Sequence, residues 1–168
     1  PPFSFWIKYL FFSVFGDSIF IARLPAILFG VGSVFLIYFI AMRIFNEVRP
    51  LQTNAGIGTL DSQKFALLAV FLFAINSAMI WIFSSALMEP ILIFLLLLNI
   101  YFFFRFLEDR RFWWIFGITL GFVALTKYTG IFLAPVYFFY LLFLNRSLFK
   151  NWRLYSAIGL SILIFLPV

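Results

Sequence analysis

The chain has 168 residues, of which 65% are hydrophobic and only 11% are charged, and its net charge is +6 at neutral pH. A soluble domain is about half apolar and about a quarter charged, so this composition excludes a protein whose whole surface faces water and calls for a surrounding bilayer. Cysteine and histidine are absent, which excludes disulfides, thiolate or imidazole metal ligands and a histidine base, and leaves any chemistry to carboxylates, Lys, Arg, Tyr or the backbone.

The first segment, residues 1–17, is short and aromatic, and it carries Lys8 before it ends at Asp17. A spanning helix needs about 20 apolar residues, so we predict an interfacial helix that lies along the outer face of the membrane. A remnant of a spanning helix is the alternative. The chain begins at Pro1 without an initiator methionine, a basic leader or a cleavage site, and it stops within an apolar run at Val168. We therefore expect an excerpt of a longer protein.

Six apolar segments follow as candidate spanning helices. They run from about Ile19 to Phe45, Phe65 to Phe83, Pro90 to Phe106, Phe112 to Thr126 and Gly130 to Leu144, and the last starts near Leu154 and continues to the end. The predicted fold class is all-α: a polytopic transmembrane helix bundle of about six spans plus the N-terminal interfacial helix. Residues 1–168 form a single transmembrane domain on this interpretation.

The basic residues separate clearly if the predicted spans alternate in direction. One side of the membrane then holds nine of the twelve, which are Arg43, Arg49, Lys64, Arg105, Arg110, Arg111, Arg146, Lys150 and Arg153. We interpret this distribution as a topological signal, so no nucleic-acid partner is expected. By the positive-inside rule that side is cytoplasmic, and the polar connector at 46–64 is a cytoplasmic loop. Residues 1–17, Ser84–Glu89 and the turn near Lys127 then face outward.

Glu89 is the first of the informative charges on the outer side, where ionisable groups are otherwise scarce. It precedes Pro90, which suits the first turn of a helix, so Glu89 is expected at the outer N-terminus of the third span. Two interpretations stay open. Glu89 is either a carboxylate that complements the helix macrodipole or a carboxylate aimed into an outward cavity, where it binds a cation or activates a nucleophile.

Lys127 and Arg23 are the outward cations of interest. The fourth span rises only about 22 Å, less than the roughly 30 Å hydrocarbon layer, so Lys127 either snorkels outward or serves a phosphate in a partly desolvated pocket. Arg23 lies at the outer entrance of the first span, where it recognises phosphate or carboxylate, or acts as an interfacial anchor. Asp17 is expected to cap a helix or form a turn. Two cations and one carboxylate on one face fit a phosphate-bearing lipid substrate.

Several motifs occur in a recognisable order along nearly the whole chain. They are Pro1-Pro2, Phe15-Gly16-Asp17-Ser18, Ala22-Arg23-Leu24-Pro25-Ala26 and Phe29-Gly30, then Ser84-Ser85-Ala86-Leu87-Met88-Glu89-Pro90, Gly117 to Gly121 and Leu125-Thr126-Lys127. This series resembles the GT-C membrane glycosyltransferases, above all the protein O-mannosyltransferases and the bacterial aminoarabinose lipid A transferases. The family pattern has a His before Pro-Pro, and we expect the excerpt to begin after that position. The sequence departs from the family pattern at Glu89, where the family more often has Asp.

The resemblance implies transfer of a sugar from a polyprenyl-phosphate donor to an acceptor on the outer face of a membrane, here the bacterial inner (plasma) membrane. Arg23 and Lys127 would contact the donor phosphate, and Glu89 would position the acceptor or a divalent cation, so Glu89 is the candidate catalytic residue and the candidate metal ligand. The family's principal catalytic acid precedes the matched region, so we expect the excerpt alone to be inactive. The sugar, the acceptor and any cofactor stay open, and the expected partners are the lipid-linked donor and membrane lipids.

Two other kinds of function remain open. A transporter or lipid flippase would place ionisable residues near the bilayer midplane, whereas the charges here cluster at predicted helix ends. A purely structural subunit would tolerate neutral replacements of Arg23, Glu89 and Lys127.

Overall fold

The computed structural model describes residues 2–54, 61–85 and 88–166. Pro1 of the first motif, the part of the predicted loop at 55–60, the pair Ala86-Leu87 of the outer motif, and Val168 lie outside the described residues. Every element in the described part is helical: α1 (Pro2–Phe15), α2 (Ile19–Asn54), α3 (Ser62–Ile75), α4 (Ser77–Ser84), α5 (Glu89–Glu108), η1 (Arg110–Phe112), α6 (Trp113–Thr126), η2 (Tyr128–Phe132), α7 (Leu133–Leu144), η3 (Arg146–Lys150) and α8 (Trp152–Phe165), where η marks a 3-10 helix. The predicted fold class, an all-α membrane bundle, is confirmed.

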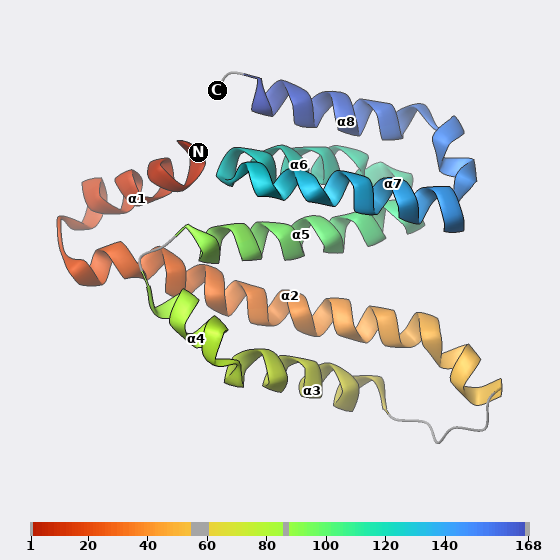
Figure 1. The fold of residues 1–168 in the computed structure, drawn as a ribbon, viewed down its shortest axis with the longest axis horizontal. Helices are drawn as coiled ribbons and strands as arrows, with labels where there is room; N and C mark the ends of the chain where they lie inside the picture. Colours follow the sequence, from red (N-terminus) through yellow and green to blue (C-terminus); the bar gives the residue numbers. More distant parts are fainter. Residues whose placement is uncertain (1, 55–60, 86–87, 167–168) are drawn as a thin grey trace.

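The helices pass back and forth along one common direction, as Figure 1 shows. The turn between α1 and α2, the start of α5 and the turn between α6 and α7 gather at one end of the bundle, which we call the Lys127 end. The later part of α2, η1 and η3 gather at the opposite end, which we call the Glu108 end. The sorting of basic residues assumed this alternation. The membrane face toward which each end points stays a prediction.

Two or three of the described helices meet the length and apolarity that a membrane crossing requires. Among the described residues, Ile19–Glu47 within α2 and Glu89–Glu108 are long and apolar enough to span a membrane, and the bent pair of α3 and α4 makes a third candidate if it counts as one span. α6 and α8 have 14 residues each and α7 has 12. A helix of 14 residues rises about 21 Å, which is less than the roughly 30 Å core. The count of about six spans stays a prediction.

The first predicted span was too short at its C-terminal end. α2 continues to Asn54, so the first nine residues of the region predicted as a loop, 46–54, are helical. Hydropathy marks where a helix leaves the apolar layer, but it does not mark where backbone hydrogen bonding stops. Glu47 lies 3.7 Å from Arg43 at i,i+4 spacing, which is a pairing that supports a helix beyond its apolar part.

The second predicted span, Phe65 to Phe83, is broken rather than continuous. α3 and α4 meet at a bend of 65°, and the break lies at Asn76, whose backbone is extended with φ −65° and ψ 117°. The Asn76 side chain accepts hydrogen bonds from the backbone N–H groups of Ala78 and Met79 at 3.0 and 3.3 Å. Asparagine is a preferred N-cap because its carbonyl satisfies such donors, so it starts a new helix inside an apolar run.

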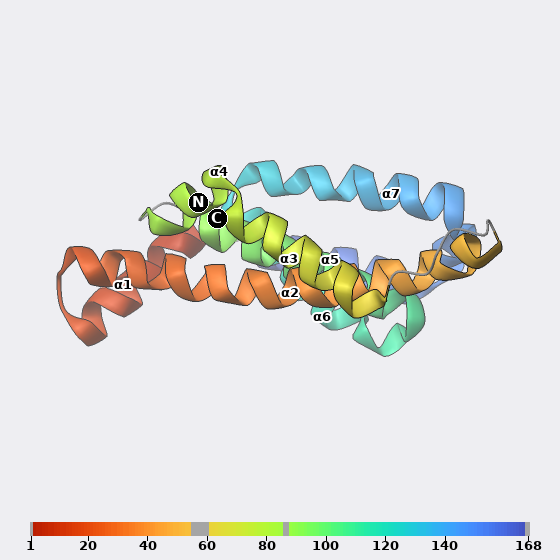
Figure 2. The same ribbon diagram turned by 90° about the horizontal axis from the view of Figure 1, so that it is seen from below.

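The centre of the bundle combines close helix packing with a buried polar network. α6 and α8 approach through Gly117, where an added Cβ would lie 2.6 Å from the Ala157 carbonyl oxygen. α7 lies apart from the layer of α2 and α5 in the view of Figure 2. Tyr137 connects α7 to α5, because the Tyr137 hydroxyl donates to Asn99 Oδ1 at 2.6 Å. Asn99 Nδ2 in turn donates to Thr119 Oγ1 at 2.8 Å. The network joins α5, α6 and α7.

Candidate functional site

Two of the residues singled out from the sequence meet at the Lys127 end. Lys127 Nζ donates to Glu89 Oε1 at 3.1 Å, although 38 positions separate them along the chain. The pair joins the start of α5 to the end of α6. The Glu89 and Lys127 side chains are 35% and 43% exposed, so the pair lies at the edge of the bundle, where a ligand can reach both charges.

Local sequence holds Glu89 at the start of α5. Pro90 occupies the first turn, where its missing N–H costs no hydrogen bond. Pro90 and Ile91 are both buried, so the first turn is anchored while Glu89 stays half-exposed. A carboxylate in the first turn also complements the positive end of the helix dipole. The sequence interpretation as a dipole-complementing carboxylate and the interpretation as a site residue both fit this position.

Lys127 is held by the way α6 ends. It is the C-cap of α6, with extended backbone at φ −160° and ψ 135°, and its N–H donates to the Val123 carbonyl. The chain then turns into η2, where the Gly130 N–H donates to the Lys127 carbonyl at 2.9 Å. A Cβ on Gly130 would lie only 2.3 Å from Val123 Cγ1 and 2.9 Å from the Val123 carbonyl oxygen. Only glycine lets the turn fold back this closely, so Gly130 fixes the direction in which Lys127 leaves the helix.

An apolar cluster lies next to the Glu89–Lys127 pair, on the same two helices. Ile91, Leu95 and Val123 are buried together, and α1 contributes Phe3, whose ring lies 4.7 Å from that of Phe122. α1 therefore braces the end of α6 beside the pair. Ile7 of α1 also packs against this cluster, whereas six other large side chains of α1 are exposed: Phe5, Trp6, Tyr9, Leu10, Val14 and Phe15. The interfacial location of α1 stays a prediction.

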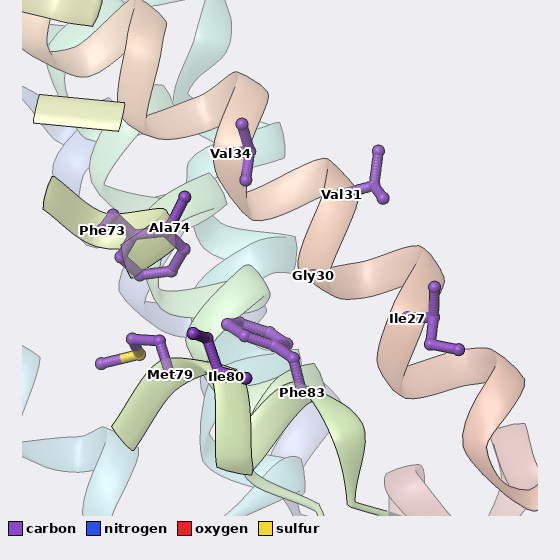
Figure 3. Close-up of a pocket in the computed structure, with 9 residues that line it drawn as sticks. All are labelled: Ile27, Gly30, Val31, Val34, Phe73, Ala74, Met79, Ile80 and Phe83. Atoms are coloured by element: carbon purple, nitrogen blue, oxygen red, sulfur yellow. The ribbon is translucent and has the colours of Figure 1, made fainter. Parts of the chain in front are cut away.

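Arg23, the third predicted site residue, does not join this pair. It is exposed on α2, and in the described part of the chain it contacts neither Glu89 nor Lys127. Arg23 and Ile27 are one turn apart and share a face of α2. That face borders an apolar cavity of about 260 Å³ between α2 and the bent pair α3 and α4, lined by Ile27, Gly30, Val31, Val34, Phe73, Ala74, Met79, Ile80 and Phe83 (Figure 3).

Asp17 lies in the turn between α1 and α2, as the sequence suggested, but the capping interaction belongs to its neighbour. The Ser18 hydroxyl accepts from the Ile21 N–H at 3.2 Å. Gly16 makes the turn possible because its φ of +83° lies in the left-handed region that glycine adopts without strain. This turn sets the start of α2 and therefore the position of Arg23.

The predicted metal role of Glu89 finds no supporting ligand set in the described residues. No three side chains of the Asp, Glu, His or Cys types gather anywhere among residues 2–54, 61–85 and 88–166. Glu89 itself faces an ammonium group, which competes with a cation for its oxygens. The metal role of Glu89 therefore stays a prediction.

Sequence reasoning missed two polar groups. Asn99 lies in the middle of the third predicted span and is fully buried, and a lone asparagine within an apolar run was the available signal. The second is a charged cluster at the Glu108 end, which includes Arg43 and Glu108. The assignment of basic residues to one side of the membrane gave no indication that these two residues pair.

The chain was compared with curated proteins, solved structures and family models. No curated protein and no solved structure matches the chain. A family model described as dolichyl-phosphate-mannose-protein mannosyltransferase matches residues 1–55 and 56–168.

Proposed function

Since the chain belongs to the dolichyl-phosphate-mannose-protein mannosyltransferase family, we propose that it takes part in transferring a sugar from a polyprenyl-phosphate donor to an acceptor on the outer face of the membrane. The family makes it a membrane glycosyltransferase. The lipid-linked donor, the acceptor side and the residues that act are the proposed part.

The observation that carries the proposal is the Glu89–Lys127 pair at the Lys127 end. In the reaction, the bond between the sugar's anomeric carbon and a phosphate oxygen breaks, and an acceptor oxygen forms the new bond. The proton that the acceptor hydroxyl loses passes to the departing phosphate or to solvent. The departing phosphate gains negative charge. A cation placed where that charge develops stabilises the transition state, and Lys127 is such a cation. Glu89 orients the Lys127 ammonium and offers an oxygen to the acceptor's hydroxyl group.

The apolar cavity beside α2 is the proposed binding site for the isoprenoid chain of the donor lipid. Its lining is almost wholly hydrocarbon and aromatic, which suits an isoprenoid chain. Arg23 lies one turn before Ile27 at the cavity wall, so a chain in this cavity places its phosphate near the Arg23 guanidinium. Arginine suits this role because its planar fork matches phosphate oxygens. Gly30 helps to shape the cavity because a Cβ there would lie 2.9 Å from the Phe83 ring.

A transporter or flippase is the second candidate, and the buried polar network weighs against it. A transport pathway needs polar groups near the midplane that a substrate can reach. Asn99 is the polar residue deep within α5, but it is fully buried and hydrogen-bonded to Thr119 and Tyr137. Its donors and acceptor are engaged within the protein, so it does not offer a binding group to a passing lipid.

The test is a transfer assay on the full-length parent protein with radiolabelled polyprenyl-phosphate mannose. Lys127→Gln and Glu89→Gln are compared with Lys64→Gln, which neutralises an exposed lysine on α3 at the Glu108 end. We expect transfer by the parent and by Lys64→Gln, and loss of transfer in the two site variants with the folded yield unchanged. Transfer that survives both site variants contradicts the site, and a parent that moves the lipid without cleaving its phosphate bond favours the flippase.

A further inference from the structure

A cluster of charges of both signs lies at the Glu108 end, opposite the proposed transfer site. Arg43 on α2 forms an ion pair with Glu108 on α5, and Arg43 Nη2 donates to the Phe104 carbonyl at 3.1 Å. Glu47 lies 3.7 Å from Arg43, and Arg105 lies 3.6 Å from Glu108. These four charged side chains share one cavity of about 350 Å³, whose other lining residues are Phe39, Met42, Asn46 and Tyr101.

The cavity lies at the ends of the two long candidate spans, where lipid headgroups would meet hydrocarbon. Glu47 and Glu108 are the last residues of the two long candidate spans. The rings of Phe39 and Tyr101, whose centroids are 6.4 Å apart, lie further back along the same two helices, toward the apolar layer. Basic pockets between membrane helices near the membrane surface bind the headgroups of anionic lipids, which shows that a charged pocket at this level can hold a headgroup. The position therefore favours a membrane lipid over a soluble ligand.

The balance of charge selects the kind of headgroup. Two arginines and two glutamates cancel, so an anionic headgroup would satisfy the guanidinium groups and leave the carboxylates facing extra negative charge. A headgroup that carries a phosphate and an ammonium complements both. The two contacts at 3.6 and 3.7 Å are longer than hydrogen bonds, and the Arg105 and Glu47 side chains are 41% and 55% exposed. These two groups keep hydrogen-bonding capacity that a ligand can use.

We propose that this cavity binds the headgroup of a zwitterionic phospholipid with a primary amine, phosphatidylethanolamine being the simplest example. The Arg105 guanidinium donates to the lipid phosphate, and the lipid ammonium donates to the Glu47 carboxylate. A primary ammonium has three N–H donors, whereas a trimethylated ammonium has none. The cavity therefore distinguishes phosphatidylethanolamine from phosphatidylcholine. This site lies at the end of the bundle remote from Glu89 and Lys127 and does not depend on the transfer reaction.

The test measures lipid binding to the full-length parent protein in detergent by native mass spectrometry. The probes are phosphatidylethanolamine, its monomethyl and dimethyl derivatives, phosphatidylcholine and phosphatidylglycerol with identical acyl chains. We expect phosphatidylethanolamine to bind about tenfold more tightly than phosphatidylcholine, as the loss of charged hydrogen bonds implies, with affinity falling stepwise as methyl groups are added. Because the methylation series uses the unaltered protein, it tests the proposal without any variant.

Variants then locate the site. Glu47→Gln removes the preference for the primary amine, and Arg105→Gln weakens the binding of every lipid in the series. Asp61→Asn and Lys64→Gln change exposed charges at the same end but outside the cavity, and they leave the preference unchanged. Equal affinity for phosphatidylethanolamine and phosphatidylcholine, tighter binding of phosphatidylglycerol, or a preference that persists in Glu47→Gln each overturn the proposal.

Discussion

Glu89 Oε1 accepts a hydrogen bond from Lys127 Nζ at 3.1 Å, so the N-terminus of α5 and the C-terminus of α6 are joined by opposite charges that each complement their own helix dipole. The pair is partly exposed, and exposed ion pairs contribute about 0–1 kcal/mol to stability. As an ion pair alone, Glu89 and Lys127 would therefore contribute little to stability. In the proposed transfer reaction, by contrast, the Lys127 charge acts on the donor phosphate.

Exchanging the two charges separates stability from activity. In the double variant Glu89→Lys with Lys127→Glu, the ion pair can re-form, but both charges oppose their helix dipoles. We expect a loss of at most about 2 kcal/mol in the free energy of unfolding and a loss of transfer of at least tenfold. Thermal unfolding in detergent and the transfer assay check the two expectations. Retained transfer in the exchanged protein would show that the direction of the charges is irrelevant to the reaction.

Tyr137→Phe tests the buried polar network. The substitution removes the hydroxyl that donates to Asn99 Oδ1 at 2.6 Å and leaves that oxygen buried without this donor. We expect a loss of about 0.6–2 kcal/mol, the range for hydrogen bonds between membrane helices, measured as a shift in the unfolding midpoint. Tyr155→Phe is the matched control, since the Tyr155 hydroxyl is at the exposed surface and donates to the Phe149 carbonyl. Equal effects of the two variants would contradict a special contribution from the network.

Asn76→Leu tests whether the break between α3 and α4 shapes the apolar cavity. Leucine continues the apolar run and removes the cap on Ala78 and Met79, which costs about 0.5–2 kcal/mol. We expect the two helices to straighten, which alters the cavity that Phe73, Met79 and Phe83 help to line, and we expect the apparent KM for the lipid donor to rise. Asn76→Asp retains a capping oxygen and should keep the bend. Distances between spin labels on α3 and α4 measure the angle directly, and an unchanged angle in Asn76→Leu would assign the bend to packing instead.

The sequence predicted the helices well and their interruptions poorly. Apolar length located α2, α5, α6, α7 and α8 because burial in lipid demands it, but a helix can extend beyond its apolar part, as α2 does to Asn54. Asn76 breaks a helix that composition alone would continue. Scarcity of charge singled out Glu89 and Lys127, whereas their contact depends on which helix ends become neighbours, and no local pattern encodes that.

The cluster at the Glu108 end shows the same limit. The positive-inside rule counts arginines and lysines by side of the membrane, so it placed Arg43 and Arg105 together without indicating the acidic partners. Glu47 and Glu108 are 61 residues apart in the chain. They line one cavity because α2 and α5 lie side by side and run in the same direction (Figure 1). Tertiary packing, which the one-dimensional pattern does not contain, created that cavity.

Gly130→Ala tests whether the turn after α6 positions Lys127 for function. An added Cβ would lie 2.3 Å from Val123 Cγ1 and 2.9 Å from the Val123 carbonyl oxygen, so the backbone of η2 must shift and Lys127, three residues earlier, must shift with it. A displacement of about 1 Å in a catalytic group can cost about a hundredfold in rate, so we expect transfer to fall by ten- to a hundredfold. The loss of stability should be about 1–3 kcal/mol, as for other overpacked sites.

Gly159→Ala is the control for this substitution because nothing lies within 4 Å of an added Cβ there. Gly159 is inside α8, and alanine is favoured over glycine within a helix by about 1 kcal/mol, so this variant should be at least as stable as the parent and fully active. Val123→Ala combined with Gly130→Ala removes the side-chain clash but keeps the clash with the carbonyl oxygen. Partial recovery of transfer in that double variant would assign the loss to the position of Lys127, whereas a fully active Gly130→Ala protein would show that the turn tolerates the shift and that Lys127 needs no fixed position.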